Sequence, residues 1–332
     1  MKKNNKDKKS IVVMGGGTGI YPVVSALKNL PVKITTVIAV SDSGGSTGRI
    51  RDEFGFPPVG DLRQSLAALA DARSQQWIQK LLLYRFEKGD GLRGHNLGNL
   101  ILTALQDMTG STTDALRKAQ NIFRISGTVI PVTEASVQLE IHYADGSVAI
   151  GEHILDEEID DPKQIVSVRL TPDCTLNPAA AKAILEADHI IIGPGDFYAS
   201  LLAVLTAPGL IEVFQKSKAE VSYILNLMTR HTQTKDMSAM DHIKKIEDSI
   251  GLELSHVLQN TQEVEPDMLE QYAKQHEFVV SDDTKSNDKR IIRSSLVADE
   301  KLDQHEADKV HRSLLRHDSA KLEKVLKQLL EL

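Results

Sequence analysis

The sequence lacks several devices that stabilise or anchor proteins. Its 332 residues include a single cysteine, Cys174, so no disulfide can form within the chain, which suits the cytosol. No apolar run approaches the roughly 20 residues that a membrane-spanning helix needs. Acidic residues outnumber basic ones and give a net charge of −7, which argues against nucleic acid as the main partner. We therefore expect a cytoplasmic protein without a transmembrane segment, stabilised by its own core.

Two cofactor motifs are also missing. The dinucleotide fingerprint G-x-G-x-x-G fails because Ile20 stands where its last glycine should be, which disfavours a nicotinamide-dependent oxidoreductase. The P-loop pattern G-x-x-x-x-G-K-S/T does not occur. Cys174 has no neighbour that would lower its pKa, so we expect it to be structural.

The most informative stretch is Ile11–Gly19, in which four apolar residues lead into a glycine cluster that includes Thr18. A helical pattern follows from Tyr21 to Leu30. The sequence therefore predicts a buried strand, a tight loop and a helix whose N-terminus faces the loop. Glycines let backbone N–H groups approach a ligand, and the helix dipole favours negative charge there. We interpret the loop as a phosphate cradle. The alternative is a glycine turn that only lets helix and sheet pack closely.

Strand and helix patterns alternate along most of the chain, which predicts a doubly wound, Rossmann-like, mostly parallel α/β sheet. The run Ala144-Asp145-Gly146-Ser147 between two alternating segments predicts an inserted antiparallel β-hairpin. We expect a basic, disordered arm at 1–9 and a single α/β domain at 10–332. Strands are expected at 11–14, 33–40, 129–133, 136–143, 148–153, 189–192 and 221–227. Helices are expected at 21–30, 62–72, 76–86, 96–108, 112–123, 178–187, from 201, at 269–276 and at 322–329.

Glycine or polar clusters follow four of the predicted strands, at 15–19, 42–49, 193–200 and 226–229. In open α/β sheets, ligands bind at the carboxyl ends of strands, so these clusters could converge on one crevice. Asp42 falls where a carboxylate commonly binds ribose hydroxyls, and it could equally hold Mg²⁺ on a phosphate. Arg49 and Arg63 could clamp phosphate oxygens. A long solvated loop at 42–49 is the alternative.

Three further residues are candidates for chemistry or binding. Asp61 is either the N-cap of the helix that follows it or a functional carboxylate. His95 could act as an acid or base, or donate a hydrogen bond to phosphate. Asn96 stands at the start of the helix expected at 96–108, close to Asn99. The motif Gly193-Pro194-Gly195-Asp196 adds a second loop of backbone donors.

Taken together, these blocks resemble the CofD/YvcK-like family over nearly the whole chain. The blocks are Gly15–Gly19, Ser41–Arg49, Pro58–Arg63, Gly94–Asn99, Gly193–Asp196, Asn226–Thr229 and Arg316–Asp318. One branch contains 2-phospho-L-lactate transferase, which makes a deazaflavin cofactor from a nucleotide-activated acid. The other is the gluconeogenesis-factor branch, whose members bind UDP-sugars such as UDP-N-acetylglucosamine and are needed for growth and cell shape on gluconeogenic carbon sources.

The segment after the second strand looks like the gluconeogenesis-factor branch. The usual Asp-Asp-Gly-Gly-Ser of that branch is here Ser-Asp-Ser-Gly-Gly-Ser, with Ser41 at the first acidic position and Ser43 at the first glycine position. This departure removes the pair of adjacent carboxylates that tight metal binding would use.

The resemblance implies a UDP-sugar-binding regulator rather than an enzyme, with Mg²⁺ as an optional companion of the ligand. A group transferase that uses a nucleotide-activated donor is the alternative. A homodimer and protein partners in cell-envelope regulation are the expected assemblies. The candidate catalytic residues are Asp42, Asp61 and His95. The candidate ligand-binding residues are Gly15, Gly16, Gly17, Thr18, Gly19, Asp42, Ser43, Gly44, Gly45, Ser46, Thr47, Arg49, Arg63, Asn96, Asn99, Gly193, Pro194, Gly195, Asp196, Asn226, Thr229 and Arg316.

Overall fold

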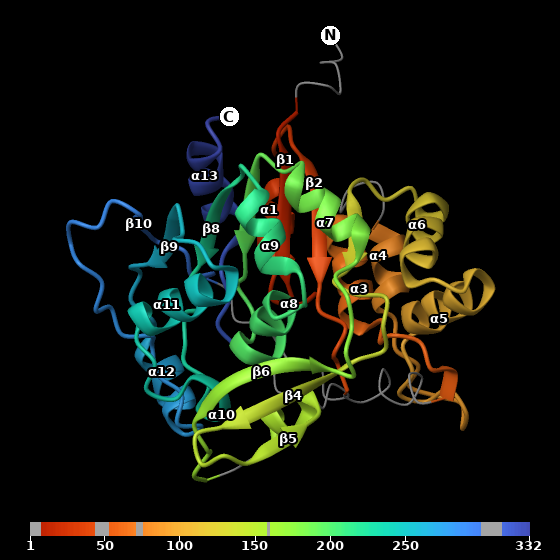
Figure 1. The fold of residues 1–332 in the computed structure, drawn as a ribbon, viewed down its shortest axis with the longest axis horizontal. Helices are drawn as coiled ribbons and strands as arrows, with labels where there is room; N and C mark the ends of the chain where they lie inside the picture. Colours follow the sequence, from red (N-terminus) through yellow and green to blue (C-terminus); the bar gives the residue numbers. More distant parts are fainter. Residues whose placement is uncertain (1–7, 44–52, 71–75, 158–159, 300–313) are drawn as a thin grey trace.

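A parallel β-sheet forms the centre of the computed structural model, which describes residues 8–43, 53–70, 76–157, 160–299 and 314–332 (Figure 1). Within these residues the sheet has seven strands in the order β10-β9-β8-β7-β1-β2-β3, and every pair is parallel. The strands are β1 (Ser10–Gly15), β2 (Lys33–Ile38), β3 (Thr128–Pro131), β7 (His189–Ile192), β8 (Glu220–Ile224), β9 (His256–Asn260) and β10 (Ile291–Ser294).

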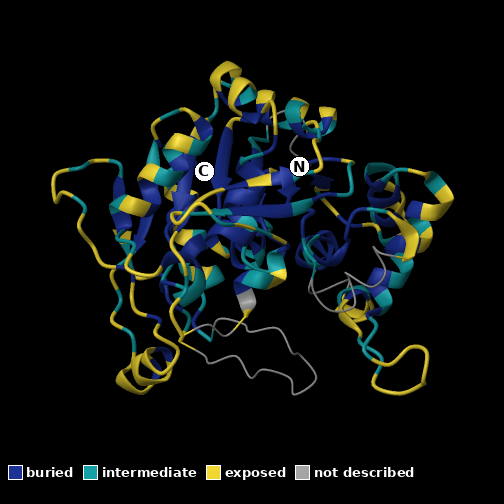
Figure 2. Cartoon of the chain, turned by 60° about the horizontal axis from the view of Figure 1, so that its bottom comes forward, coloured by how far each residue is buried: buried dark blue, intermediate teal, exposed yellow. Residues whose placement is uncertain are grey.

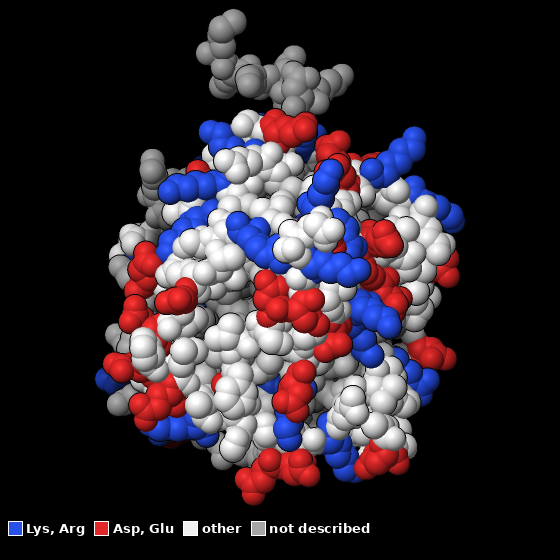
Figure 3. Space-filling view, turned by 90° about the vertical axis from the view of Figure 1, so that its left-hand side faces the viewer, with Lys and Arg blue, Asp and Glu red and all other residues white. Residues whose placement is uncertain are grey.

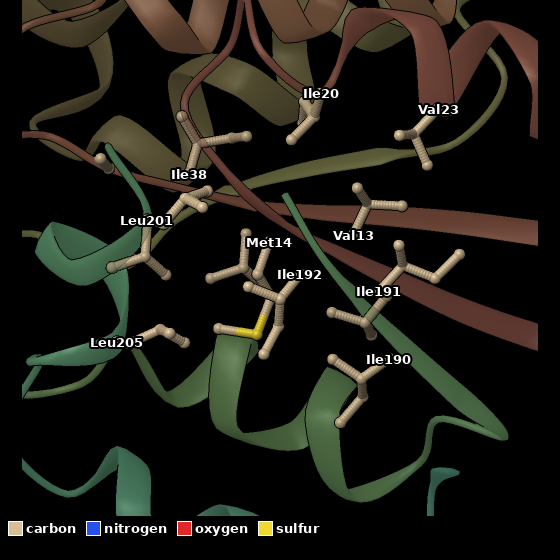
Figure 4. Close-up of a cluster of buried hydrophobic side chains, with 14 of the residues drawn as sticks. Val13, Met14, Ile20, Val23, Ile38, Ile190, Ile191, Ile192, Leu201 and Leu205 are labelled. Atoms are coloured by element: carbon tan, nitrogen blue, oxygen red, sulfur yellow. The ribbon is translucent and has the colours of Figure 1, made fainter. Parts of the chain in front are cut away.

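The central strands β1 and β7 are buried on both faces, as continuous apolar runs in parallel sheets usually are. Met14 of β1 pairs with Ile192 of β7, and Leu201 and Leu205 pack beside them (Figure 4). Figure 2 shows the sheet as a buried layer, with exposed residues along the outer faces of the helices. The hydrophobic core therefore lies directly behind the loops that leave these two strands.

The connections follow the doubly wound pattern that the sequence predicts. From β1 the chain moves to β2 and then to β3 on one side, whereas β7, β8, β9 and β10 follow one another on the other side. Right-handed crossovers in opposite directions place their helices on opposite faces of the sheet. The helices are α1 (Tyr21–Leu27), α3 (Gly60–Leu69), α4 (Gln76–Leu83), α5 (Leu97–Thr109), α6 (Thr112–Phe123), α7 (Pro178–Leu185), α8 (Ala203–Leu205), α9 (Leu210–Lys216), α10 (His231–Thr234), α11 (Ala239–Ile250), α12 (Pro266–Ala273) and α13 (Ser319–Leu329).

A small antiparallel sheet lies beyond the carboxyl ends of the parallel strands (Figure 1). Its strand order is β5-β4-β6, with β4 at Gln138–Tyr143, β5 at Val148–Ile150 and β6 at Ile165–Thr171. The predicted hairpin is β4 and β5, and a 3-10 helix, η1 (Glu152–Asp156), follows it. The insertion is therefore confirmed, but it carries a third strand, β6, that was not predicted.

The structure corrects several other predictions about elements. Asp61 is not the N-cap of its helix, because α3 begins at Gly60 and its N-cap is Val59. The helix expected from Leu201 begins earlier, as a π-helix, η2 (Phe197–Leu202), that continues into α8. The hydrophobic spacing also failed to predict β9, β10 and α11. Side-chain caps at Asn96, Ser111, Asn177 and Asp318 are present.

In the described part of the chain, no single helix is long and apolar enough to cross a membrane. The pair Phe197–Leu205 and Leu210–Lys216 meets the length and composition criteria only when taken together, and it is bent by 66°. The face on the side of β10 carries acidic and basic side chains intermixed (Figure 3).

Candidate functional site

The strand order places a topological switch point between β1 and β7, where the chain changes the direction in which it builds the sheet. Ligands of open α/β sheets bind outside the carboxyl ends of the strands at such a point. The loop Gly15–Gly19 leaves β1 there, and the loop Gly193–Asp196 leaves β7. The other two predicted clusters follow the neighbouring strands β2 and β8. The four clusters thus lie on four consecutive strands.

Gly17 and Gly19 are required by close approach between segments that are distant in the sequence. A β-carbon at Gly17 would overlap the backbone carbonyl of Asp61, and one at Gly19 would overlap the carbonyl oxygen of Pro194. The first glycine loop is therefore pressed against both α3 and the second glycine loop. The backbone N–H groups of Thr18 and Gly195 donate to no protein acceptor within the described residues.

Asn226 fastens the second glycine loop to the end of β8. Its side-chain amide donates to the carbonyl oxygen of Gly195 at 2.8 Å, and its Oδ1 accepts from the Tyr223 hydroxyl at 3.0 Å. Gly193 has a φ of +74°, which favours glycine, and the peptide bond to Pro194 is cis. Asn226, predicted to line the ligand, thus supports the loop in this structure.

Asp61 is the most perturbed carboxyl of this region. Burial, together with the nearby negative charges of Asp42 and Asp196, raises the pKa of Asp61 from 3.8 to about 7. A hydrogen bond from the backbone of Gly17 and the positive charge of Arg63 act in the opposite direction. The carboxyl of Asp61, in the first turn of α3, therefore lies close enough to those of Asp42 and Asp196 for their charges to act on it. At neutral pH, Asp61 exchanges between its protonated and ionised forms.

The helix η1 bridges the loops that follow β2 and β8. The Ser43 hydroxyl lies 3.0 Å from Nδ1 of His153, and it accepts from the backbone N–H of His153 at 3.1 Å. Two residues along, the carbonyl oxygen of Leu155 accepts from the hydroxyl of Thr232 in α10. Since β1 and β7 lie between β2 and β8, η1 crosses over the switch point. The predicted residues Gly44, Gly45, Ser46, Thr47 and Arg49 lie outside the described residues.

Gln233 is a contributor that the sequence analysis did not identify. Its Oε1 accepts from the backbone N–H groups of Tyr198 at 3.0 Å and Ala199 at 3.3 Å. It thereby satisfies two backbone N–H groups in the first turn of η2 that would otherwise lack an acceptor within the helix. Gln233 lies in α10, so only the tertiary fold brings it to this helix end. Tyr198 packs in the core, and its hydroxyl donates to the carbonyl of Ile165.

Arg63, Asn96 and Asn99 form a buried group near the start of α5. Nη1 of Arg63 donates to the carbonyl of Leu82 at 3.2 Å. The Asn96 side chain caps α5 by accepting from the backbone N–H of Asn99 at 3.2 Å. Asn96 therefore has a structural role as a helix cap, and the backbone of Leu82 holds the guanidinium of Arg63 in place. His95 belongs to the turn before α5, where its backbone bonds to Phe86 and Leu92.

Two predicted residues lie beyond the end of β8. Thr229 makes two hydrogen bonds with the backbone of Phe278. Its N–H donates to the Phe278 carbonyl at 2.7 Å, and its hydroxyl accepts from the Phe278 N–H at 2.9 Å. Arg316 precedes His317, which is buried and bonds to the backbone of Leu225. The block Arg316–Asp318 thus lies beside the loop 226–229, as it would if both belonged to one binding site.

An ion pair that the sequence did not indicate lies next to this loop. Nε of Arg230 is 3.6 Å from Oε1 of Glu277, and both side chains are largely buried. Burial is the main reason that the pKa of Glu277 is raised to about 6; the positive charge of Arg230 opposes this shift, and the negative charge of Asp196 adds to it.

A cavity of about 370 Å³ lies away from the switch point, between the segments that follow β3 and β6. Cys174 is partly buried in its wall, and burial raises the pKa of its thiol, as expected for a structural cysteine. Among the described residues, no group of three or more His, Cys, Asp or Glu is arranged to hold a metal ion. The cavity is lined by Thr133, Glu134, Ala135, Asp173, Cys174, Thr175, Leu176, Asn177 and Pro178.

Comparison with known proteins gives a consistent family. Residues 11–297 match the family described as 2-phospho-L-lactate transferase CofD. A Bacillus subtilis protein named gluconeogenesis factor is 34% identical, and the match covers 98% of this chain and 99% of that protein. A Listeria innocua protein of the same name is 36% identical over 95% of this chain and 97% of its own length.

A solved structure shows the same fold. The crystal structure of a UPF0052-family protein from Bacillus halodurans aligns with a TM-score of 0.86 at 33% identity, covering 96% of this chain and 99% of that one. The chain belongs to the CofD family, and its curated relatives in that family are named gluconeogenesis factors.

Proposed function

We propose that this protein is a gluconeogenesis factor that binds a UDP-sugar, UDP-N-acetylglucosamine being the first candidate, and supports growth and cell shape on gluconeogenic carbon sources. One observation carries the proposal. Two glycine loops, at Gly15–Gly19 and Gly193–Asp196, adjoin each other at the switch point of a doubly wound sheet. Such a place suits a diphosphate held by backbone N–H groups. The family relationship supports the choice of a nucleotide-linked ligand.

Most of the predicted loops contribute to binding in this proposal. The two glycine loops hold the diphosphate, and Asp42 contacts ribose or sugar hydroxyls. Arg49, Arg63 or Arg316 neutralises phosphate charge, and Asn226 and Thr229 form the wall next to the base or sugar. Where Mg²⁺ is needed, it binds as a complex with the phosphates of the ligand. Binding shifts a conformational equilibrium and requires no turnover.

Calorimetric titration with UDP-N-acetylglucosamine, GDP and NAD, each with and without Mg²⁺, tests the proposal. We expect selective UDP-sugar binding with no heat of turnover. The Gly19→Ala variant should bind far more weakly, because its methyl group would push the two loops apart. The matched control is Gly91→Ala, since a β-carbon there meets open space. Preference for GDP or NAD, or unchanged binding by Asp42→Ala, would count against this account.

The second candidate is a group transferase that uses a nucleotide-activated donor. The observation in its favour is Asp61, because a carboxyl with a pKa of about 7 beside Asp42 and Asp196 has the properties of a general base at neutral pH. Asp61 would take a proton from an acceptor hydroxyl as that oxygen attacks the donor's phosphorus atom. Release of free nucleotide only when an acceptor is added would support this candidate, and its loss in Asp61→Asn would assign the base.

A further inference from the structure

A row of exposed apolar side chains runs along α4 and the residue that follows it, on the side of the molecule that bears α3, α5 and α6. Trp77 and Leu81, four residues apart, share one face of α4, and Tyr84 directly follows the last residue of the helix, three residues after Leu81. Their exposed fractions are 75%, 44% and 50%. Leu82, on a different face, is fully buried and fixes the helix to the core. We call the three exposed residues the α4 stripe.

The composition of the α4 stripe is unusual for this chain. The whole sequence has one tryptophan and six tyrosines, yet a Trp and a Tyr stand seven residues apart on this short surface. The ring of Tyr84 also packs edge to face on Phe86, with centroids 5.2 Å apart, and Nζ of Lys80 lies 5.1 Å from the centre of the Trp77 ring. Trp and Tyr are the residues that most often dominate the binding energy of protein interfaces.

We propose that the α4 stripe is a self-association surface on which a second copy of this chain docks about a two-fold axis. From Trp77 to Tyr84 the stripe reads aromatic, aliphatic, aromatic, which is self-complementary when a second α4 packs antiparallel to the first. With the axis near Leu81, Trp77 of one copy faces Tyr84 of the other. A two-fold interface requires this kind of patch, which matches itself.

The exposed area is consistent with such a dimer. From the exposed fractions, the three side chains present about 350 Å² per copy, on the scale of 150–250 Å² for a fully buried aromatic residue. A standard interface buries about 800 Å² per partner, of which the centre is apolar and the rim polar. The α4 stripe therefore supplies the centre, and the polar residues around it, including Lys80, supply the rim. We expect a dimer of modest, micromolar affinity.

The single tryptophan makes the test direct. Sedimentation velocity of the whole protein over a range of concentrations should show a monomer–dimer equilibrium, and the emission of Trp77 should shift to shorter wavelength as the dimer forms. Leu81→Asp keeps the probe and should weaken the dimer by about tenfold or more. The control is Ile150→Ser, which removes an equally exposed apolar side chain from β5 and should change neither measurement.

Cross-linking locates the axis. In a Cys174→Ser background, Leu81→Cys should form a disulfide-linked dimer on oxidation, because residues at a two-fold axis face their own copies. Ile150→Cys should not. The inference is overturned if the wild-type protein stays monomeric at every concentration, or if Leu81→Asp dimerises as well as the wild type. It is equally overturned if a monomer instead binds lipid vesicles through Trp77, since the surface would then serve a membrane.

Discussion

Replacing Asp61 by Asn should stabilise the protein, and the gain should depend on pH. Burial and the charges of Asp42 and Asp196 raise the pKa of Asp61 from 3.8 to about 7. The fold therefore binds a proton that the unfolded chain releases, and its stability falls as the pH rises from about 4 to about 7. This difference in pKa between the folded and the unfolded chain means that an ionised Asp61 destabilises the fold by about 4 kcal/mol. Solvent that reaches part of the side chain reduces this penalty to about 2–4 kcal/mol.

The Asn side chain is neutral at every pH, and its Oδ1 can still accept from Gly17. We therefore expect Asp61→Asn to raise the free energy of unfolding by about 2–4 kcal/mol at pH 8 and by only about 1 kcal/mol at pH 4.5. Urea unfolding of both proteins at the two pH values measures the difference. The control is Asp145→Asn, because Lys163 and Ser147 hold the pKa of that exposed carboxyl well below its usual range, so this variant should show no gain at pH 8. An equal effect of Asp61→Asn at both pH values would refute the electrostatic argument.

Three further outcomes follow from the packing. Leu205→Ala, which empties space behind the β1 and β7 loops, should lower stability by about 2–5 kcal/mol in thermal or urea unfolding. Gln233→Ala should lower it by about 1–3 kcal/mol, because the amides of Tyr198 and Ala199 lose their acceptor, and hydrogen exchange at these two amides should accelerate. Cys174 should react with a thiol reagent at pH 8 more slowly than a free thiol, since burial raises its pKa; faster reaction would contradict the assigned burial.

The sequence predicted those parts of the fold that short-range chemistry determines. Asn177 before Pro178 marked the start of α7, and Asp145-Gly146 marked the hairpin between β4 and β5. Apolar runs marked β1 and β7. Each of these signals lies within a few residues of the element that it specifies, so no knowledge of the tertiary fold was needed.

Contacts between distant segments could not be predicted in the same way. Val59 takes the N-cap position that was expected of Asp61, which leaves that carboxyl to turn toward Gly17. Gln233 caps η2 from another helix, and no local pattern pairs the two. The helix α11 did carry a usable signal, since Ser238 and Asp241 form a capping box, and that signal was overlooked.

The location of the proposed site makes ligand binding depend on pH and on Mg²⁺. A diphosphate between the glycine loops would lie close to Asp42, Asp61 and Asp196, which repel it when ionised. Protonation of Asp61, or Mg²⁺ carried by the ligand, would relieve that repulsion. Binding without Mg²⁺ should therefore weaken as the pH rises through about 7, the pKa of Asp61.

A crystal structure of the protein with UDP-N-acetylglucosamine tests the central claim most directly. The account predicts that the diphosphate lies at the switch point between β1 and β7, with its oxygens about 3 Å from backbone N–H groups of the loops Gly15–Gly19 and Gly193–Asp196. The cavity beside Cys174, with Glu134 and Asp173 in its wall, offers the ligand another location. A diphosphate bound in that cavity, or away from both glycine loops, would contradict the account.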